Sequence, residues 1–167
     1  KAVGESADRL ASALTGENKT QGNFGELKLK ELLDGMGLTE GLEYETQQTL
    51  RDDNGNIIKD NETGRRMIPD VILHFPDMVI DSKISFKAFE DYQNADGEKE
   101  RAEALKRHIA SVRSHVKELK SKDYSKYLTK GSARLDFVIM YVFSEGALQL
   151  ALSNDAALWR DAYDDGV

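Results

Sequence analysis

The sequence has no cysteine, only two prolines and one tryptophan, and no long hydrophobic run. The absence of cysteine excludes disulfides and thiolate metal sites, which is compatible with a reducing compartment such as the cytoplasm. The longest apolar run, residues 137–143, is far shorter than the roughly 20 residues of a membrane-spanning helix. With 40% hydrophobic and 32% charged residues in a chain of 167, the composition is typical of one globular domain.

The chain also lacks an initial methionine and a signal peptide. We therefore expect it to be a piece of a longer protein, and its missing targeting segments say little about where that protein resides. Residues 1–17 are predicted to form an N-terminal helical extension, and residues 18–167 to form the core domain.

The net charge of −7 argues at first against a nucleic-acid partner, because phosphate binding usually requires a basic surface. The charge is unevenly distributed, however. Residues 105–134 contain nine basic residues against Glu118 and Asp123, a net charge of about +7. This segment is a candidate DNA-binding surface, and a solvated basic helix face is the equally open alternative.

Hydrophobic periodicity predicts the order of the elements. The first core helix starts near Asn18 and ends near Gly35 and Gly37, with an apolar stripe of Phe24, Leu29, Leu32, Leu33 and Met36. Strands are expected at residues 44–50, at about 64–73, at 78–84 and, buried on both faces, at 135–143. Helices are expected at 86–92, 98–119 and 145–163, the second with a stripe of Ala102, Leu105, Ile109, Val112, Val116 and Leu119.

This order predicts an α/β fold with a mixed sheet flanked by helices. The first three strands are close enough in sequence to form a meander. A long helix between the third and fourth strands suits a crossover connection, which would make those two strands parallel.

The third predicted strand carries the most specific chemical pattern. Side chains alternate along a strand, so Val79, Asp81 and Lys83 share one face. An antiparallel neighbour would bring Asp70 near Asp81, and two close carboxylates repel each other unless a cation such as Mg²⁺ or Mn²⁺ lies between them. A buried Asp81–Lys83 ion pair, with Asp70 capping a turn, is the alternative that the strand alone leaves open.

Glu26 on the first core helix adds a third acid. It lies three positions before Leu29 and seven before Leu33, so it is expected on the inward stripe. Gly22 and Gly25 would let this helix start approach a strand or a phosphate closely. An ordinary helix start, with Glu26 complementing the macrodipole, is the alternative.

These residues are also where the chain resembles a known family, the RmuC proteins. The resemblance covers about residues 20–165 and departs at Phe24, Ser85 and Ser144. Its motifs are residues 22–26, Tyr44, Gln47, Pro69-Asp70, Asp81-Ser82-Lys83, the helix with His108, Arg113 and His115, and residues 136–138 leading to Glu145. The ordered set is more specific than any one of its short motifs.

RmuC proteins are assigned to the PD-(D/E)XK nuclease superfamily, so the resemblance implies a restriction-endonuclease-like fold with core order αβββαβ. It implies metal-dependent hydrolysis of DNA phosphodiester bonds in recombination or rearrangement. By the same resemblance Asp70, Asp81 and Glu26 bind Mg²⁺ or Mn²⁺, and Lys83 orients the attacking water or stabilises the developing charge. Gln47 is expected to touch that water or the lysine.

The long helix is expected to supply DNA contacts through His108, Arg113, His115, Lys106 and Lys117. His108 and His115 lie seven positions apart and therefore share a face, although two satisfied histidines at the edge of the core are the alternative. Tyr124 and Tyr127 either contact DNA or pack.

Full-length RmuC proteins are expected to carry an upstream membrane anchor and a coiled coil, so the resemblance implies a cytoplasmic domain and self-association through the coiled coil. The partner is then DNA, and no small-molecule substrate is expected. Two other functions stay open: a DNA-binding module of the same fold that cuts poorly, and a structural assembly domain whose acids are only ion-paired.

Overall fold

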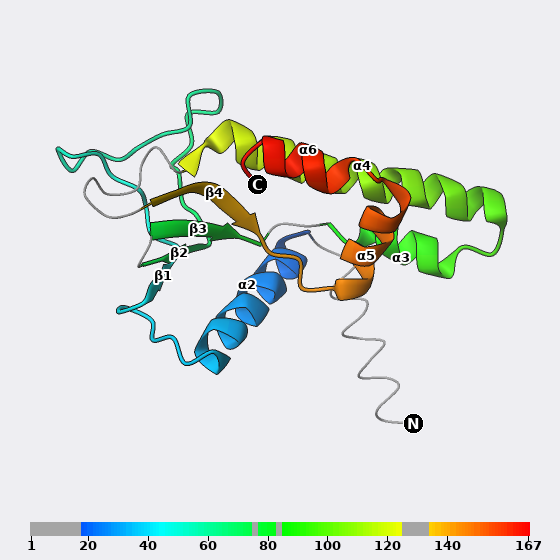
Figure 1. The fold of residues 1–167 in the computed structure, drawn as a ribbon, viewed down its shortest axis with the longest axis horizontal. Coiled ribbons are helices and arrows are strands. Elements are labelled where there is room, and N and C mark those ends of the chain that lie inside the picture. The colour runs from blue at the N-terminus through cyan, green and yellow to red at the C-terminus, as the bar shows by residue number, and fades with distance from the viewer. Residues whose placement is uncertain (1–17, 75–76, 83–84, 125–133) are drawn as a thin grey trace.

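The computed structural model describes residues 18–74, 77–82, 85–124 and 134–167 (Figure 1). The predicted extension at residues 1–17 lies outside these residues. The elements, in chain order, are α2 (Asn18–Gly35), β1 (Tyr44–Thr46), β2 (Val71–Leu73), β3 (Asp77–Asp81), α3 (Lys87–Asn94), α4 (Glu98–Lys122), β4 (Arg134–Met140), α5 (Glu145–Asn154) and α6 (Leu158–Asp164).

Within the described residues the strands form one four-stranded sheet in the order β1-β2-β3-β4. The pairs β1–β2 and β2–β3 are antiparallel, and β3–β4 is parallel. The predicted meander and the predicted parallel pair are therefore confirmed. The parallel pair follows from the crossover through α3 and α4, which returns the chain to the starting end of β3.

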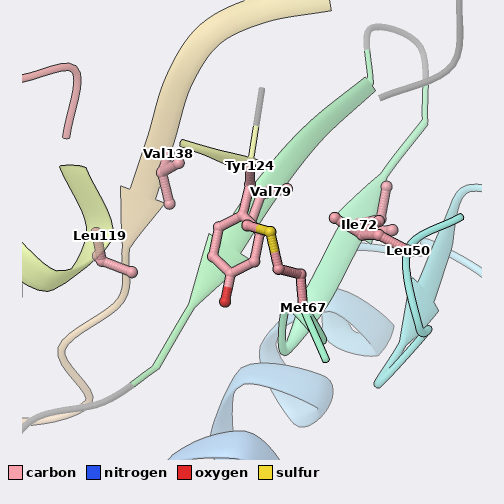
Figure 2. Packing of buried hydrophobic residues seen from close by; sticks show 7 residues of the cluster. All are labelled: Leu50, Met67, Ile72, Val79, Leu119, Tyr124 and Val138. Atoms are coloured by element: carbon pink, nitrogen blue, oxygen red, sulfur yellow. The ribbon is translucent and has the colours of Figure 1, made fainter. Parts of the chain in front are cut away.

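The sheet lies between α2 and the last turns of α4. On one face, Leu29 and Leu33 of α2 pack with Tyr44, Val71 and Ile80 of the strands. The other face carries a cluster that joins the sheet to the end of α4 and to the loop between β1 and β2: Leu50, Met67, Ile72, Val79, Leu119, Tyr124 and Val138. Figure 2 shows the ring of Tyr124 lying among Met67, Val79 and Val138. Because neighbouring side chains alternate between faces, Ile72 and Val79 contact one layer while Val71 and Ile80 contact the other.

A separate cluster of Phe86, Val112, Ala147, Ala151 and Leu158 joins the helices to one another. Figure 1 shows α6 running along α4, with α5 leading into it. The helices after β3 thus form their own packed unit, which extends beyond the edge of the sheet.

Several expectations about these elements are wrong. No strand runs continuously from residue 64 to 73: the segment between β1 and β2 contains isolated bridges, and β2 starts only at Val71. The single helix expected at 145–163 is two helices, because the backbone leaves helical geometry at Asp155, whose carboxylate binds Arg113 at 2.6 Å.

The predicted burial also needs correction. The fourth strand is not buried on both faces: among described strands β4 pairs only with β3, and Ile139 is 41% exposed. On α2, Leu29 and Leu33 are buried but Leu32 is exposed, as is Met36 directly after the helix. In the first half of α4 the buried positions are Ala104 and His108, while Ala102 is exposed.

Candidate functional site

Asp70 and Asp81 lie side by side at the ends of β2 and β3. In the β2–β3 register Val71 pairs with Ile80 and Ile72 with Val79, so one further step sets Asp70 opposite Asp81. Both acids lie on the sheet face of Ile72 and Val79, and they are 3% and 0% exposed, respectively. The expectation that an antiparallel neighbour brings the two acids together is confirmed.

Asp70 is held rigidly. One carboxylate oxygen accepts a hydrogen bond from Gln47 Nε2 at 3.0 Å, and the other accepts from the backbone N–H of Ser82 at 2.6 Å. The backbone N–H of Gln47 also donates to the carbonyl oxygen of Asp70 at 3.1 Å. Gln47 itself has a φ of 51°, a left-handed conformation that turns the chain at the end of β1. Gln47 therefore orients Asp70 directly. Its expected contact with the attacking water or with Lys83 stays a prediction, because Lys83 lies outside the described residues.

Helix α2 approaches the end of β3 at Gly25. A Cβ atom at this position would lie 2.5 Å from Ser82 Oγ and 3.5 Å from Phe143 Cδ1, so only glycine fits without a shift of its neighbours. The predicted close approach of this helix start to a strand is confirmed at Gly25. As a result Glu26, the next residue, is half-buried at the edge of the same acidic site.

A cleft of about 500 Å³ opens over Asp70 and Glu26. Glu26, Gln47 and Asp70 line its inner end. One wall is formed by residues 60–68 of the loop between β1 and β2, and the opposite wall by Glu118, Ser121, Lys122 and Tyr124 at the end of α4. The cleft therefore leads from solvent to Asp70, the neighbour of Asp81.

Tyr124 closes one side of this cleft. The chain leaves α4 through Asp123, which has a left-handed φ of 42°, and this turn directs Tyr124 into the core. Tyr124 is almost fully buried. Burial, and after it the negative charges of Asp81 and Asp70, raises the pKa of the Tyr124 hydroxyl well above its ordinary value, so the phenol is neutral beside the two acids. Packing is thus the role that the structure gives Tyr124.

The acidic site offers oxygen donors that a metal ion could use. Among the residues that the structure describes, no three His, Asp or Glu side chains lie close enough together to hold one as they stand. Mg²⁺, however, commonly binds through one or two carboxylates and takes its other ligands from water and phosphate. Asp70 and Asp81, with Glu26 beside them, are hard oxygen donors of this kind, so their chemistry fits Mg²⁺ or Mn²⁺. Lys83 lies outside the described residues.

The two histidines of α4 occupy different environments. His108 is fully buried, and its Nε2 lies 2.7 Å from the carbonyl oxygen of Ala147 on α5. In this position His108 has no access to a phosphate, so it is not a DNA contact in this structure; it joins two helices. His115 is half-buried, with Nδ1 3.7 Å from a carboxylate oxygen of Glu118.

The basic residues of α4 are largely ion-paired within the chain. Arg113 binds both carboxylate oxygens of Asp155, at 2.6 and 2.9 Å, and Asp161 at 2.8 Å. Arg107, Lys120 and Lys122 bind Asp91, Asp165 and Glu118, respectively. Arg113 is therefore occupied by acids of the next helices. Lys106 and Lys117 are exposed, with no ion pair among the described residues, and remain candidates for DNA contact.

From the sequence alone, Arg65 and Arg66 are not recognisable as residues of the cleft. Arg65 and Arg66 are exposed and line the cleft wall opposite α4. Their only signal in the sequence is two adjacent arginines shortly before Pro69-Asp70, in a segment that we expected to be partly a strand.

Comparison with known proteins places this arrangement in a family. A family model described as RmuC family matches residues 1–167. The chain belongs to the RmuC family. It is 40% identical to a DNA recombination protein RmuC homolog of Vibrio cholerae over 99% of this chain and 31% of that protein. It is also 40% identical to the DNA recombination protein RmuC of Escherichia coli K12, over 99% of this chain and 33% of that protein.

The chain spans about a third of the length of these RmuC relatives. No solved structure matches it. In the part of the chain that the structure describes, no helix is both long and apolar enough to cross a membrane.

Proposed function

We propose that this chain is the metal-dependent DNA nuclease domain of an RmuC-type DNA recombination protein. The observation that carries the proposal is the pair Asp70 and Asp81, two buried acids set opposite each other, of which Asp70 lines an open cleft. Two carboxylates at one site suit a hard divalent cation, whose charge offsets their mutual repulsion. Relatives of similar sequence are named DNA recombination proteins, which supports DNA as the substrate.

The restriction-endonuclease-like assignment is part of this proposal. An antiparallel meander followed by a helical crossover to a parallel fourth strand agrees with the αβββαβ order expected for that superfamily. The acids lie at the ends of the second and third strands, where the sequence motif sets them.

In the proposed site, Asp70 and Asp81 hold Mg²⁺ or Mn²⁺, and Glu26 lies at its edge. A bound divalent ion neutralises charge on the scissile phosphate and lowers the pKa of a bound water. Gln47 and the Ser82 backbone N–H fix the orientation of Asp70. Lys83, two residues after Asp81, is our candidate for the group that orients the attacking water and stabilises charge on the phosphate.

The test is cleavage of labelled linear, single-stranded and circular DNA in the presence of Mg²⁺ or Mn²⁺. We expect metal-dependent cutting by the wild-type chain and a loss of at least about 100-fold in Asp81→Asn and Lys83→Ala, which remove charge at the site. Circular dichroism checks that both variants are folded. Calorimetric titration with Mn²⁺ alone should show binding to the wild-type chain and none to Asp81→Asn.

The matched control is Asp77→Asn. Asp77 is a buried acid on the same strand, but it lies at the other end of β3 and binds His74 at 3.2 Å. Its substitution should leave cutting unchanged. Cutting that persists in Asp81→Asn would identify a contaminating nuclease. DNA binding without metal-dependent cutting would instead favour the alternative of a DNA-binding module that keeps the fold, and absence of both would favour a structural domain.

A further inference from the structure

The loop between β1 and β2 has a defined shape near its tip. Asp60 N donates to the carbonyl oxygen of Arg65, and Gly64 N donates to that of Asp60, both at 2.8 Å. A carboxylate oxygen of Asp60 accepts from the backbone N–H groups of Glu62 and Thr63, at 2.9 and 2.7 Å. These bonds, with Gly64 at a φ of 66°, close a tight turn directly before Arg65 and Arg66.

The base of the same loop is anchored in the core. Leu50 N donates to the carbonyl oxygen of Met67 at 3.0 Å, and Met67 N donates to that of Ile58 at 3.1 Å. Leu50 and Met67 are buried in the cluster that contains Tyr124. The two arginines therefore project from a loop that is tied to the sheet immediately beside Asp70.

The cleft that Arg65 and Arg66 line is otherwise mainly acidic. Five carboxylates line the cleft, those of Glu26, Asp60, Glu62, Asp70 and Glu118. Such a surface repels a polyanion unless cations are available within it. Lys122 also lines the cleft, but it is bound to Glu118 at 2.7 Å and lies over the Tyr124 ring. Among the residues that the structure describes, no ion pair engages Arg65 or Arg66.

Asp60 does not compensate the arginines. Hydrogen bonds from the backbone of Thr63, its largest influence, lower the pKa of the Asp60 carboxyl, because its charge is directed into the turn. Arg65 and Arg66 are thus the cations of the cleft that remain available to bind an anionic ligand.

We infer that Arg65 and Arg66 bind backbone phosphates of a DNA strand that enters the cleft and passes Asp70. This inference rests on the proposed function. It assigns the main DNA contacts to the loop wall of the cleft, in place of the Lys106 and Lys117 contacts expected on helix α4. Guanidinium groups suit this role because they stay charged and bind phosphate through two parallel hydrogen bonds.

The test compares two double variants that each remove two positive charges. Arg65→Ala with Arg66→Ala removes the loop pair, and Lys106→Ala with Lys117→Ala removes two exposed cations of α4. Binding of fluorescently labelled single-stranded and duplex DNA is measured by anisotropy in EDTA, between 50 and 200 mM salt, so that the readout does not depend on cleavage.

We expect the loop variant to bind DNA at least about tenfold more weakly, with a salt slope reduced by about two, because each lost phosphate contact removes about one unit. The α4 variant should change affinity by less than about threefold. Arg65→Lys with Arg66→Lys keeps the charge and should restore most of the affinity, which separates binding from a folding defect.

Equal or greater weakening in the α4 variant, or wild-type affinity in the loop variant, would overturn the inference, as would a wild-type chain with no affinity for DNA. Arginine-dependent binding by a chain that never cuts DNA would support the inference and overturn the nuclease proposal. The failure of one is therefore distinguishable from the failure of the other.

Discussion

The basic residues of helix α4 from position 105 onward are mostly ion-paired within the chain, whereas two arginines of the loop beside it are exposed in an acidic cleft. The helix has most of the basic residues of the segment 105–134, yet Arg107, Arg113, Lys120 and Lys122 all bind acids of this same chain. The cleft has an excess of acids, one of which, Asp70, is buried beside Asp81, and its two arginines are exposed.

The difference shows that local charge counted along the sequence does not locate a binding surface. A cation that is already bound to a carboxylate releases little free energy on meeting a phosphate, because the new contact must replace the old one. An exposed cation without such a partner does not have this cost. The following predictions test whether α4 is a structural helix and the cleft the functional region.

The largest effect is expected at His108, on the inner side of α4. His108→Ala removes a fully buried ring and its hydrogen bond to Ala147, and should lower the free energy of unfolding by about 3 kcal/mol. Urea unfolding measures this change. His115→Ala, at a half-buried position on the same helix, is the control and should cost less than about 1 kcal/mol. A stable His108→Ala chain with weakened DNA binding would instead support α4 as a DNA-binding surface.

An intermediate effect is expected at Gly25, on the cleft side. Gly25→Ala sets a methyl group 2.5 Å from Ser82 Oγ, and the strain should outweigh the gain in helix propensity and destabilise the fold by about 1 kcal/mol. Because Ser82 N holds Asp70, metal-dependent cleavage should fall as well.

Gly35→Ala supplies the matched control for this substitution. Gly35 ends the same helix, and no atom lies within 4 Å of its added methyl group, so the fold should not lose stability. Equal stability and equal activity in the two alanine variants would show that the close contact of α2 with β3 is unimportant.

The smallest effect is expected at Arg113 on the outer side of α4. Arg113→Ala should lower the melting temperature slightly at pH 7 and leave DNA affinity unchanged. Hydrogen bonding to Arg113 lowers the pKa of the Asp155 carboxyl below its ordinary value of 3.8. A depressed carboxyl pKa stabilises the fold above the unfolded-state pKa and loses this contribution as pH falls through the folded-state value.

The difference in melting temperature between wild type and Arg113→Ala should therefore shrink as the pH falls below about 4. Calorimetric scans across this range measure it. Lys117→Ala, which removes an exposed cation of the same helix, should show no such pH dependence. A difference that persists at low pH would mean that Arg113 acts through packing and not through its ion pairs.

Much of the site was predictable because it depends on local rules. Alternation along β3 set Asp81 on the face of Val79, and a meander of consecutive strands set Asp70 opposite it. The glycine at position 25 indicated a close approach, which the structure has at Ser82. Such features follow from periodicity and from short connections between neighbouring elements.

The roles of His108, Arg113, Arg65 and Arg66 were not predictable in this way. The partner of Arg113 lies 42 positions further along the chain, and that of His108 lies 39 positions away. Nothing in the local pattern distinguishes a paired cation from an exposed one. The sequence by itself therefore determined most of the element order and the pairing of the two acids. The tertiary structure decided which charges face each other and which face the solvent, because charge partners are set by the packing of distant elements.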